Sequence, residues 1–203
     1  WRHVTFDTCK NVIYKGDSDS HNFIKEAFIN PEDLVPRNMT RLYDTAIEEI
    51  EILCKKRDNM QKNLPKFAKK LDIKVIAFFT LLTDGQDNQS GNNSNIKMRQ
   101  MIEKARKEGV VCTFLGANQN AEFVGPEYGF SQGNSLTFAT NAPIGEKSDD
   151  TGIYNALRSA SSNVARACSS GGGDCISFSK MQRTSSAAPR EYKVLPSKKK
   201  ISK

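Results

Sequence analysis

One apolar run and the acidic loop after it, residues 74–88 (KVIAFFTLLTDGQDN), constrain the fold more than any other feature. Residues 75–82 are apolar except for Thr80 and rich in β-branched and aromatic side chains. This pattern is typical of a parallel strand that helices cover on both faces. The run stops at Thr83-Asp84-Gly85. Because open α/β sheets bind ligands beyond the carboxyl ends of their strands, Asp84 is the first candidate functional residue.

Asp84 and the loop after it allow two interpretations. Asp-Gly is a common turn pair, because the aspartate side chain bonds to nearby backbone and glycine accepts a positive φ. Asp87, Asn88 and two further polar residues follow, and such a cluster of side-chain oxygens suits a hard cation such as Mg²⁺ or Ca²⁺. The same cluster equally suits a plain polar loop, and the residue types alone leave both interpretations open.

The other segments predict helices and strands around this run. Strands are expected at 110–115 and 135–139, and two short β-rich runs predict an antiparallel hairpin, 2–6 with 11–15. Helices are expected at 21–28, 42–56, 96–108 with Ile96 facing inward, 121–128 and from residues 149–151 onward. The polar, basic segment 59–70 is expected to lead by a loop into the central strand. Strand, helix and strand in succession predict a right-handed parallel crossover. The expected fold is therefore α/β, with a doubly wound, mostly parallel sheet flanked by helices and an antiparallel edge hairpin.

The length of 203 residues allows one domain with a sizeable core and a tail. No run approaches the roughly 18 apolar residues of a membrane span. Net charge is +7, and four lysines lie within the last six residues. We therefore expect a domain at 1–168, a flexible lysine-rich tail at 169–203, and most of the positive excess in that tail.

Cysteine usage indicates the compartment. The five cysteines lack the paired spacing of a zinc site or a disulfide framework: Cys9, Cys54, Cys112, Cys168 and Cys175. A reducing, cytoplasmic (intracellular) location is the simplest expectation. Because the chain begins at Trp1, inside an expected strand, we also expect it to be a piece of a longer protein.

Two motifs within residues 1–168 make the chain similar to the von Willebrand factor type A (vWA) domain. The stretch 81–85, LLTDG, resembles the family's strand end whose aspartate belongs to the metal-ion-dependent adhesion site. The stretch 36–44, PRNMTRLYD, resembles the loop whose threonine is another part of that site. The resemblance implies that Thr40 and Asp84 are metal-site residues, and we expect Asp87 and Asn88 beside them to contact the partner.

The chain also departs from the family. Family members carry Asp-x-Ser-x-Ser at the end of their first, central strand, and these 203 residues contain no such motif. The expectation is an N-terminally truncated domain, in which the strand ending at Asp84 has an unpaired edge. Two ligands hold an ion poorly, so binding of Mg²⁺, Mn²⁺ or Ca²⁺ by this chain should be weak or absent.

The resemblance implies a protein-interaction module that binds an Asp or Glu of a partner through a divalent metal site when that site is complete. An enzyme is not expected, because the sequence has no phosphate-binding glycine loop, no Gly-x-Ser-x-Gly and no histidine paired with a nucleophile. The alternative is nucleic-acid or acidic-partner binding through the basic tail, which would depend steeply on salt. No membrane contact is expected.

Overall fold

The computed structural model describes residues 2–6, 10–15, 40–84, 87–140, 151–170 and 177–187. Its centre is a parallel three-stranded sheet in the order β3-β4-β5. The strands are β3 (Phe78–Thr83), β4 (Val111–Ala117) and β5 (Ser135–Phe138). Every residue of the middle strand, β4, is buried. The predicted α/β class with a parallel sheet flanked by helices is thus confirmed.

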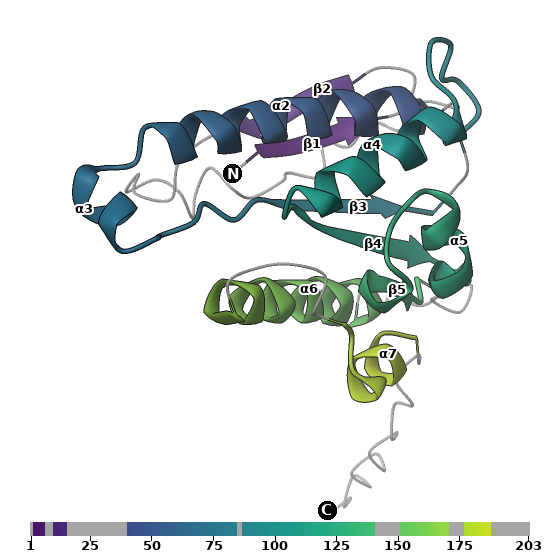
Figure 1. The fold of residues 1–203 in the computed structure, drawn as a ribbon. Coiled ribbons are helices and arrows are strands. Elements are labelled where there is room, and N and C mark those ends of the chain that lie inside the picture. The colour runs from purple at the N-terminus through teal and green to yellow at the C-terminus, as the bar shows by residue number, and fades with distance from the viewer. Residues whose placement is uncertain are drawn as a thin grey trace, which may run out of the picture.

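Helices cover both faces of this sheet (Figure 1). The helices α2 (Leu42–Lys62) and α4 (Asn95–Lys107) pack on one face, and α6 (Thr151–Ser170) packs on the other. Because side chains alternate along a strand, β4 serves both layers. Cys112 and Phe114 pack with α2 and α4, whereas Val111 and Leu115 pack with α6. Two covered faces explain why β4 reads as a continuous apolar run.

Aromatic side chains fill the face under α2 and α4. The Phe114 ring lies 5.9 Å from that of Tyr128, edge to face, and 5.5 Å from that of Phe130. Tyr128 and Phe130 follow α5 (Ala121–Glu127), and the chain continues through η2 (Gln132–Asn134) into β5. The turn after α5 requires glycine, since Gly129 has φ +93° and a Cβ there would lie 2.6 Å from the carbonyl oxygen of Arg99.

Two helices differ from their predicted form. In α4 the prediction placed Ile96 inward, but its side chain is 69% exposed and Met98 is buried instead. The α2 helix continues to Lys62, beyond its predicted end at residue 56, and α3 (Lys66–Lys70) follows it. Most of the segment 59–70, for which no helix was predicted, is therefore helical. Residues 55–62 contain no glycine or proline and are mostly good helix formers, and Pro65 separates the two helices.

The N-terminal strands β1 (Arg2–Phe6) and β2 (Lys10–Lys15) pair antiparallel as a separate two-stranded sheet. Phe6 packs against the core, and Lys10 forms ion pairs with Glu48 and Glu49 of α2. Within the described residues β3 pairs only with β4, and no ladder joins β1 or β2 to β3. The predicted place of the hairpin at the edge of one large sheet therefore stays a prediction.

Part of the predicted tail is packed. Residues 177–187, which include α7 (Lys180–Ala187), lie against β5 and α6. Phe178 is buried beside β5 residues, and the N–H of Ala139 donates to the carbonyl of Ser186 over 3.0 Å. Arg183 donates to the carbonyl of Ser135 over 2.7 Å. The range assigned to a flexible tail thus includes a docked helix. The helix predicted at 21–28 and the terminal lysines lie outside the described residues.

Candidate binding edge of the sheet

The predicted site lies where the strands end. Asp84 follows β3 directly, and its side chain is exposed. The segment after β4 reaches toward it, because Gln119 donates from Nε2 to the carbonyl of Thr83 over 3.1 Å. Gly116 leaves room for this crossing, since a Cβ there would lie 2.8 Å from Gln119. The ends of the two strands are therefore joined by a side-chain hydrogen bond at the edge where ligands of α/β sheets bind.

The loop after β3 is fastened to the segment before α2. Asn88 accepts at Oδ1 from the N–H of Thr40 over 2.6 Å, and its own N–H donates to the Thr40 carbonyl over 3.1 Å. This pairing brings two predicted site residues, half-buried Thr40 and exposed Asn88, side by side. No hydrogen bond between Thr40 and Asp84 is present in the described residues.

The same loop caps α2. The helix starts after Arg41, whose side chain makes no cap. The free amides of its first turn are met from the loop: Asp87 accepts from the N–H of Tyr43 over 3.3 Å, and Ser90 accepts at Oγ from the N–H of Asp44 over 3.0 Å. Ser90 in turn donates from Oγ to Asp87 Oδ1 over 2.5 Å. A carboxylate here also suits the positive end of the helix dipole, so Asp87 has a structural role.

A buried carboxylate, that of Asp44, fastens the end of the loop at Gly91 and Asn93. Asp44 is 2% exposed, and it accepts from Arg41 Nη2 over 3.1 Å, the Gly91 N–H over 3.3 Å and Asn93 Nδ2 over 2.8 Å. Burial alone raises the pKa of Asp44, but these hydrogen bonds and the charge of Arg41 outweigh it and the pKa falls below its ordinary value. Sequence reasoning missed Asp44, because the loop that buries it is distant in the chain.

Two tyrosines pack together near this edge of the sheet. The rings of Tyr43 and Tyr128 lie 6.0 Å apart, edge to face. Burial, aided by the neighbouring Tyr43 and the charge of Glu127, raises the pKa of Tyr128 to about 12. Burial and the charge of Asp87 also raise the pKa of Tyr43. Both phenols are therefore neutral at ordinary pH, and the pair links the start of α2 to the turn after α5.

The donor set can be tested against the predicted metal ion. Thr40 offers a hydroxyl and Asp84 a carboxylate, whereas the carboxylates of Asp87 and Asp44 are already acceptors for loop and helix donors. Within the described part of the chain, no three His, Cys, Asp or Glu side chains are grouped to hold a metal ion. A hard cation takes about 6 oxygens. These donors alone therefore do not fit a bound Mg²⁺, Mn²⁺ or Ca²⁺.

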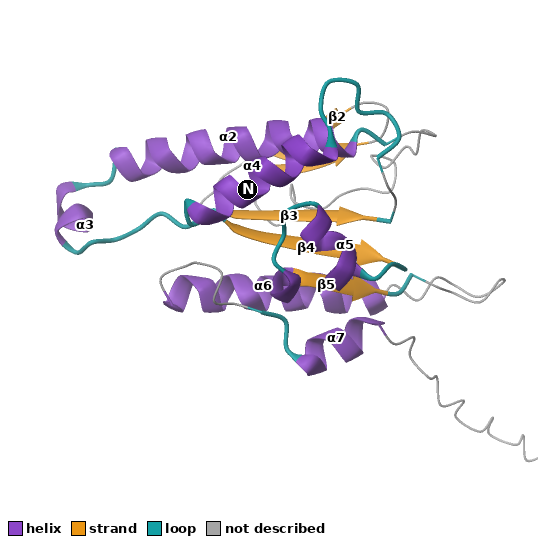
Figure 2. Ribbon diagram, turned by 45° about the vertical axis from the view of Figure 1, so that its right-hand side comes forward, coloured by secondary structure: helices purple, strands orange, loops and turns teal. Residues whose placement is uncertain are grey.

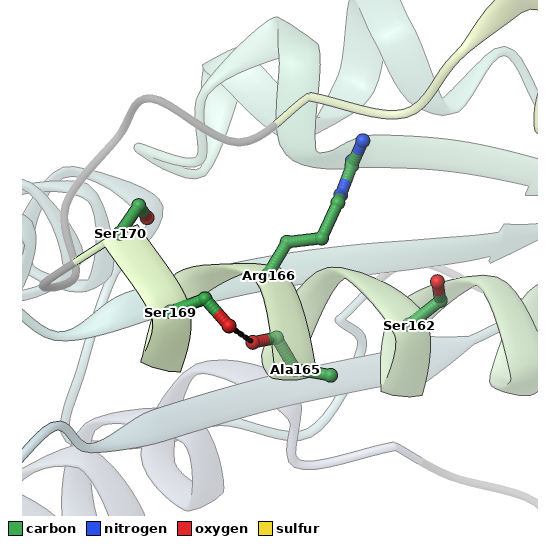
Figure 3. Close-up of a pocket in the computed structure, with 5 residues that line it drawn as sticks. All are labelled: Ser162, Ala165, Arg166, Ser169 and Ser170. Atoms are coloured by element: carbon green, nitrogen blue, oxygen red, sulfur yellow. Dashed lines mark hydrogen bonds between the residues drawn. The ribbon is translucent and has the colours of Figure 1, made fainter.

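A surface hollow lies on the C-terminal half of α6 (Figure 3). It is lined by Ser162, Ala165, Arg166, Ser169 and Ser170. Ser169 donates from Oγ to the Ala165 carbonyl over 3.1 Å, and Arg166 donates from Nη2 to the Ser177 carbonyl over 2.9 Å. These contacts serve the helix and the packing of the 177–187 segment, so the hollow shows no group set aside for a ligand.

Fold and edge together define an α/β protein with a parallel three-stranded sheet and a polar loop fastened at its carboxyl edge. No family model, no curated protein and no solved structure matches the chain. The resemblance to the vWA domain rests on the two sequence motifs alone.

Proposed function

We propose that the chain is a protein-interaction module of the vWA type, without catalytic activity. It binds an acidic group of a partner through a divalent metal site, when that site is complete, at the carboxyl edge of its sheet. One observation carries the proposal: Asp84 is exposed at the end of β3, beside a loop whose Asn88 is hydrogen-bonded to Thr40. Fastening to α2 gives this loop a defined shape, and a preorganised polar surface costs less ordering entropy when a partner binds.

The arrangement of strands supports the finer part of the proposal, a vWA or Rossmann-like sheet. In the described residues β3 is a parallel strand with a ladder on one side only, and the β1–β2 pair forms a sheet of its own. A further strand between them would join both into one sheet. In this proposal a divalent ion enters only with ligands from outside these 203 residues, such as the family's Asp-x-Ser-x-Ser.

Titration of the full chain with a short glutamate-containing peptide, followed by NMR of the backbone amides, tests the proposed edge. At high Mg²⁺ concentration we expect shifts at Thr40, Asp84 and Asn88, because the ion can then bridge the Asp84 carboxylate and the peptide carboxylate. The shifts should be lost in Asp84→Asn and when Mg²⁺ is left out. The matched control is Asp72→Asn. Asp72 is exposed and lies ahead of β3, and asparagine tolerates its φ of +50°. Equal loss in both variants, or shifts centred elsewhere, would overturn the proposal.

Paramagnetic Mn²⁺ gives a second readout in the same experiment, because even weak binding broadens nearby amide signals. We expect broadening around Asp84 only at high Mn²⁺ concentration, since two oxygen ligands hold an ion poorly. Tight Mn²⁺ binding by the isolated chain would contradict the donor set described above. Broadening around Asp72 equal to that around Asp84 would mean that the edge has no preference for the ion.

The alternative, binding of nucleic acid or an acidic partner through the C-terminal lysines, is carried by sequence alone, because residues 188–203 lie outside the described part. It predicts binding that weakens steeply with salt and disappears when Lys198, Lys199, Lys200 and Lys203 are changed to glutamine. The Asp84→Asn variant would retain such binding.

Cysteine placement supports an intracellular location for this module. Cys112 is buried, Cys54 is half-buried and Cys168 is exposed, and all three are free thiols. Among the helices that the structure describes, none combines the length and apolarity needed to cross a bilayer.

A further inference from the structure

The C-terminal half of α2 and all of α3 form a projection, residues 55–74, which we call the basic arm. Figures 1 and 2 show α3 at its tip, beyond the amino ends of the strands and opposite the edge that carries Asp84. The basic arm contains eight Lys or Arg residues and two Asp residues. Its net charge of +6 is close to the +7 of the whole chain, so the positive excess is not confined to the tail.

The basic arm also exposes large apolar side chains. Phe67 is 65% exposed and Leu71 is 71% exposed. Their spacing of four residues places them on the same side of α3, while Ala68 points inward and is 4% exposed. Met60 and Ile73 of the basic arm are 50% and 44% exposed. Single exposed apolar residues are common on protein surfaces, whereas a group of them, as at the tip of this projection, is typical of an interaction site.

Lysines surround this apolar tip. Lys66, Lys69 and Lys70 lie in α3 itself, and in the described residues none of them forms an ion pair. Lys69 donates to the carbonyl of Lys62 over 2.7 Å, which fixes its position and leaves its charge uncompensated. The tip therefore combines two exposed apolar side chains with three uncompensated positive charges.

In contrast to the expectation from the sequence, we propose that the basic arm binds an anionic membrane surface, with Phe67 and Leu71 entering the interface and the α3 lysines contacting lipid phosphates. Amphipathic helical segments with lysines beside large apolar side chains are typical of such binding. Single-stranded nucleic acid fits less well, because its bases stack on several aromatic side chains of a binding protein, and Phe67 is the only aromatic residue of the basic arm.

Co-sedimentation of the full chain with lipid vesicles tests this proposal. We expect binding to vesicles of phosphatidylcholine with phosphatidylserine and much weaker binding to phosphatidylcholine alone. Changing the three α3 lysines to glutamine should lower the partition coefficient on the order of 100-fold. The double variant Phe67→Ser and Leu71→Ser should lower it about tenfold or more, because two apolar side chains no longer leave water.

Matched controls separate the basic arm from general charge. Lys97, Lys104 and Lys107 lie exposed on α4, and changing them to glutamine removes the same charge elsewhere. A glutamine variant of Lys198, Lys199, Lys200 and Lys203 removes four charges from the tail, one more than the α3 variant. Both controls should retain at least several times the vesicle binding of the α3 lysine variant. All the substituted α3 and α4 side chains are exposed, so the variants should fold, which circular dichroism checks.

Insertion has its own readout. A Phe67→Trp variant should show fluorescence quenching by brominated lipids beyond that of the parent chain, which contains one tryptophan, Trp1. Equal vesicle binding by the arm variants and the parent would overturn the proposal, and so would loss in the tail variant alone. Arm variants that lose a DNA duplex but keep the vesicles would assign the basic arm to nucleic acid. Binding unaffected by the serine variants would refute insertion.

Discussion

The substitution Asp44→Asn tests whether a buried carboxylate holds the loop at the binding edge. Asp44 is 2% exposed and accepts hydrogen bonds from Arg41, Gly91 and Asn93. Asparagine has nearly the same shape, so the change removes charge and one acceptor without leaving a cavity. Its amide group must then face at least one of the three donors.

The expected loss follows from those three hydrogen bonds. A hydrogen bond to a charged group contributes about 1.5–3 kcal/mol, and a donor left buried without an acceptor costs a similar amount. Asparagine keeps one carbonyl oxygen, which can satisfy one or two of the donors. Arg41 is partly exposed and recovers some hydration. We therefore expect the free energy of unfolding to fall by about 3 kcal/mol.

The pH dependence gives a second signature of the same carboxylate. Its pKa is lowered in the folded protein, so its contribution is fully present above the ordinary aspartate pKa. That contribution is lost as the pH falls through the lower, folded-state pKa. The difference between wild type and Asp44→Asn should therefore be constant from neutral pH down to about pH 4 and shrink below it.

Urea denaturation followed by circular dichroism from pH 7 to pH 3 provides the measurement. The control is Asp72→Asn, which removes a solvent-exposed ion pair with Lys74 and should cost less than about 1 kcal/mol. Two results would refute the reasoning: a loss for Asp44→Asn no larger than that of the control, or a difference that stays unchanged at low pH.

Three further predictions concern the same edge and its supports. Ser90→Ala should cost about 1 kcal/mol and speed amide exchange in the first turn of α2, whereas Ser90→Thr should restore both. Gly129→Ala should lower the free energy of unfolding by more than about 1 kcal/mol, because alanine is strained in the left-handed backbone and its Cβ meets the Arg99 carbonyl. Gly91→Ala, which has open space around it, should leave the thermal unfolding temperature nearly unchanged. Absorbance titration should find one phenol ionising near pH 12 that disappears in Tyr128→Phe, and the stability it contributes should be full below pH 10 and decline as the pH rises toward 12.

Strands and helices with strong local patterns could be predicted from the sequence. The run before Asp84 and the run at 110–115 both became parallel strands, because an apolar run flanked by helices has few other stable placements. The expectation that both faces of the first run are covered is met only in part, because Leu81 and Thr83 are buried in β3 whereas Thr80 is exposed. The starting residue of β3 could not be predicted. The ladder begins where Phe78 pairs with Val111, and residues 75–77 lie outside the assigned strand although the carbonyl of Ala77 accepts from the N–H of Val111 over 2.9 Å. Ladder length depends on the partner strand, which local pattern does not contain.

The site was predictable only where it lies directly at a strand end. Asp84 follows from the apolar run, and its exposure agrees with that placement. Capping of α2 by Asp87 and Ser90 was not predictable, because each bond joins residues more than 40 positions apart. Docking of α7 escaped prediction for a similar reason. A Ser-rich, weakly apolar segment is held by Phe178 and by Arg183. The Arg183 guanidinium donates to the carbonyls of two η2 residues and to that of Ser135, the first residue of β5.

The two proposed surfaces lie at opposite ends of β3, and this separation makes them independent. Asp84 follows the carboxyl end of the strand, while the basic arm ends ahead of its amino end. A six-residue strand spans about 20 Å, which exceeds the screening length of roughly 8 Å at physiological salt. Charge changes on α3 should therefore leave peptide binding at Asp84 unaffected, and Asp84→Asn should leave vesicle binding unaffected. The same geometry lets one chain contact a membrane with the basic arm and turn its binding edge toward a partner in solution.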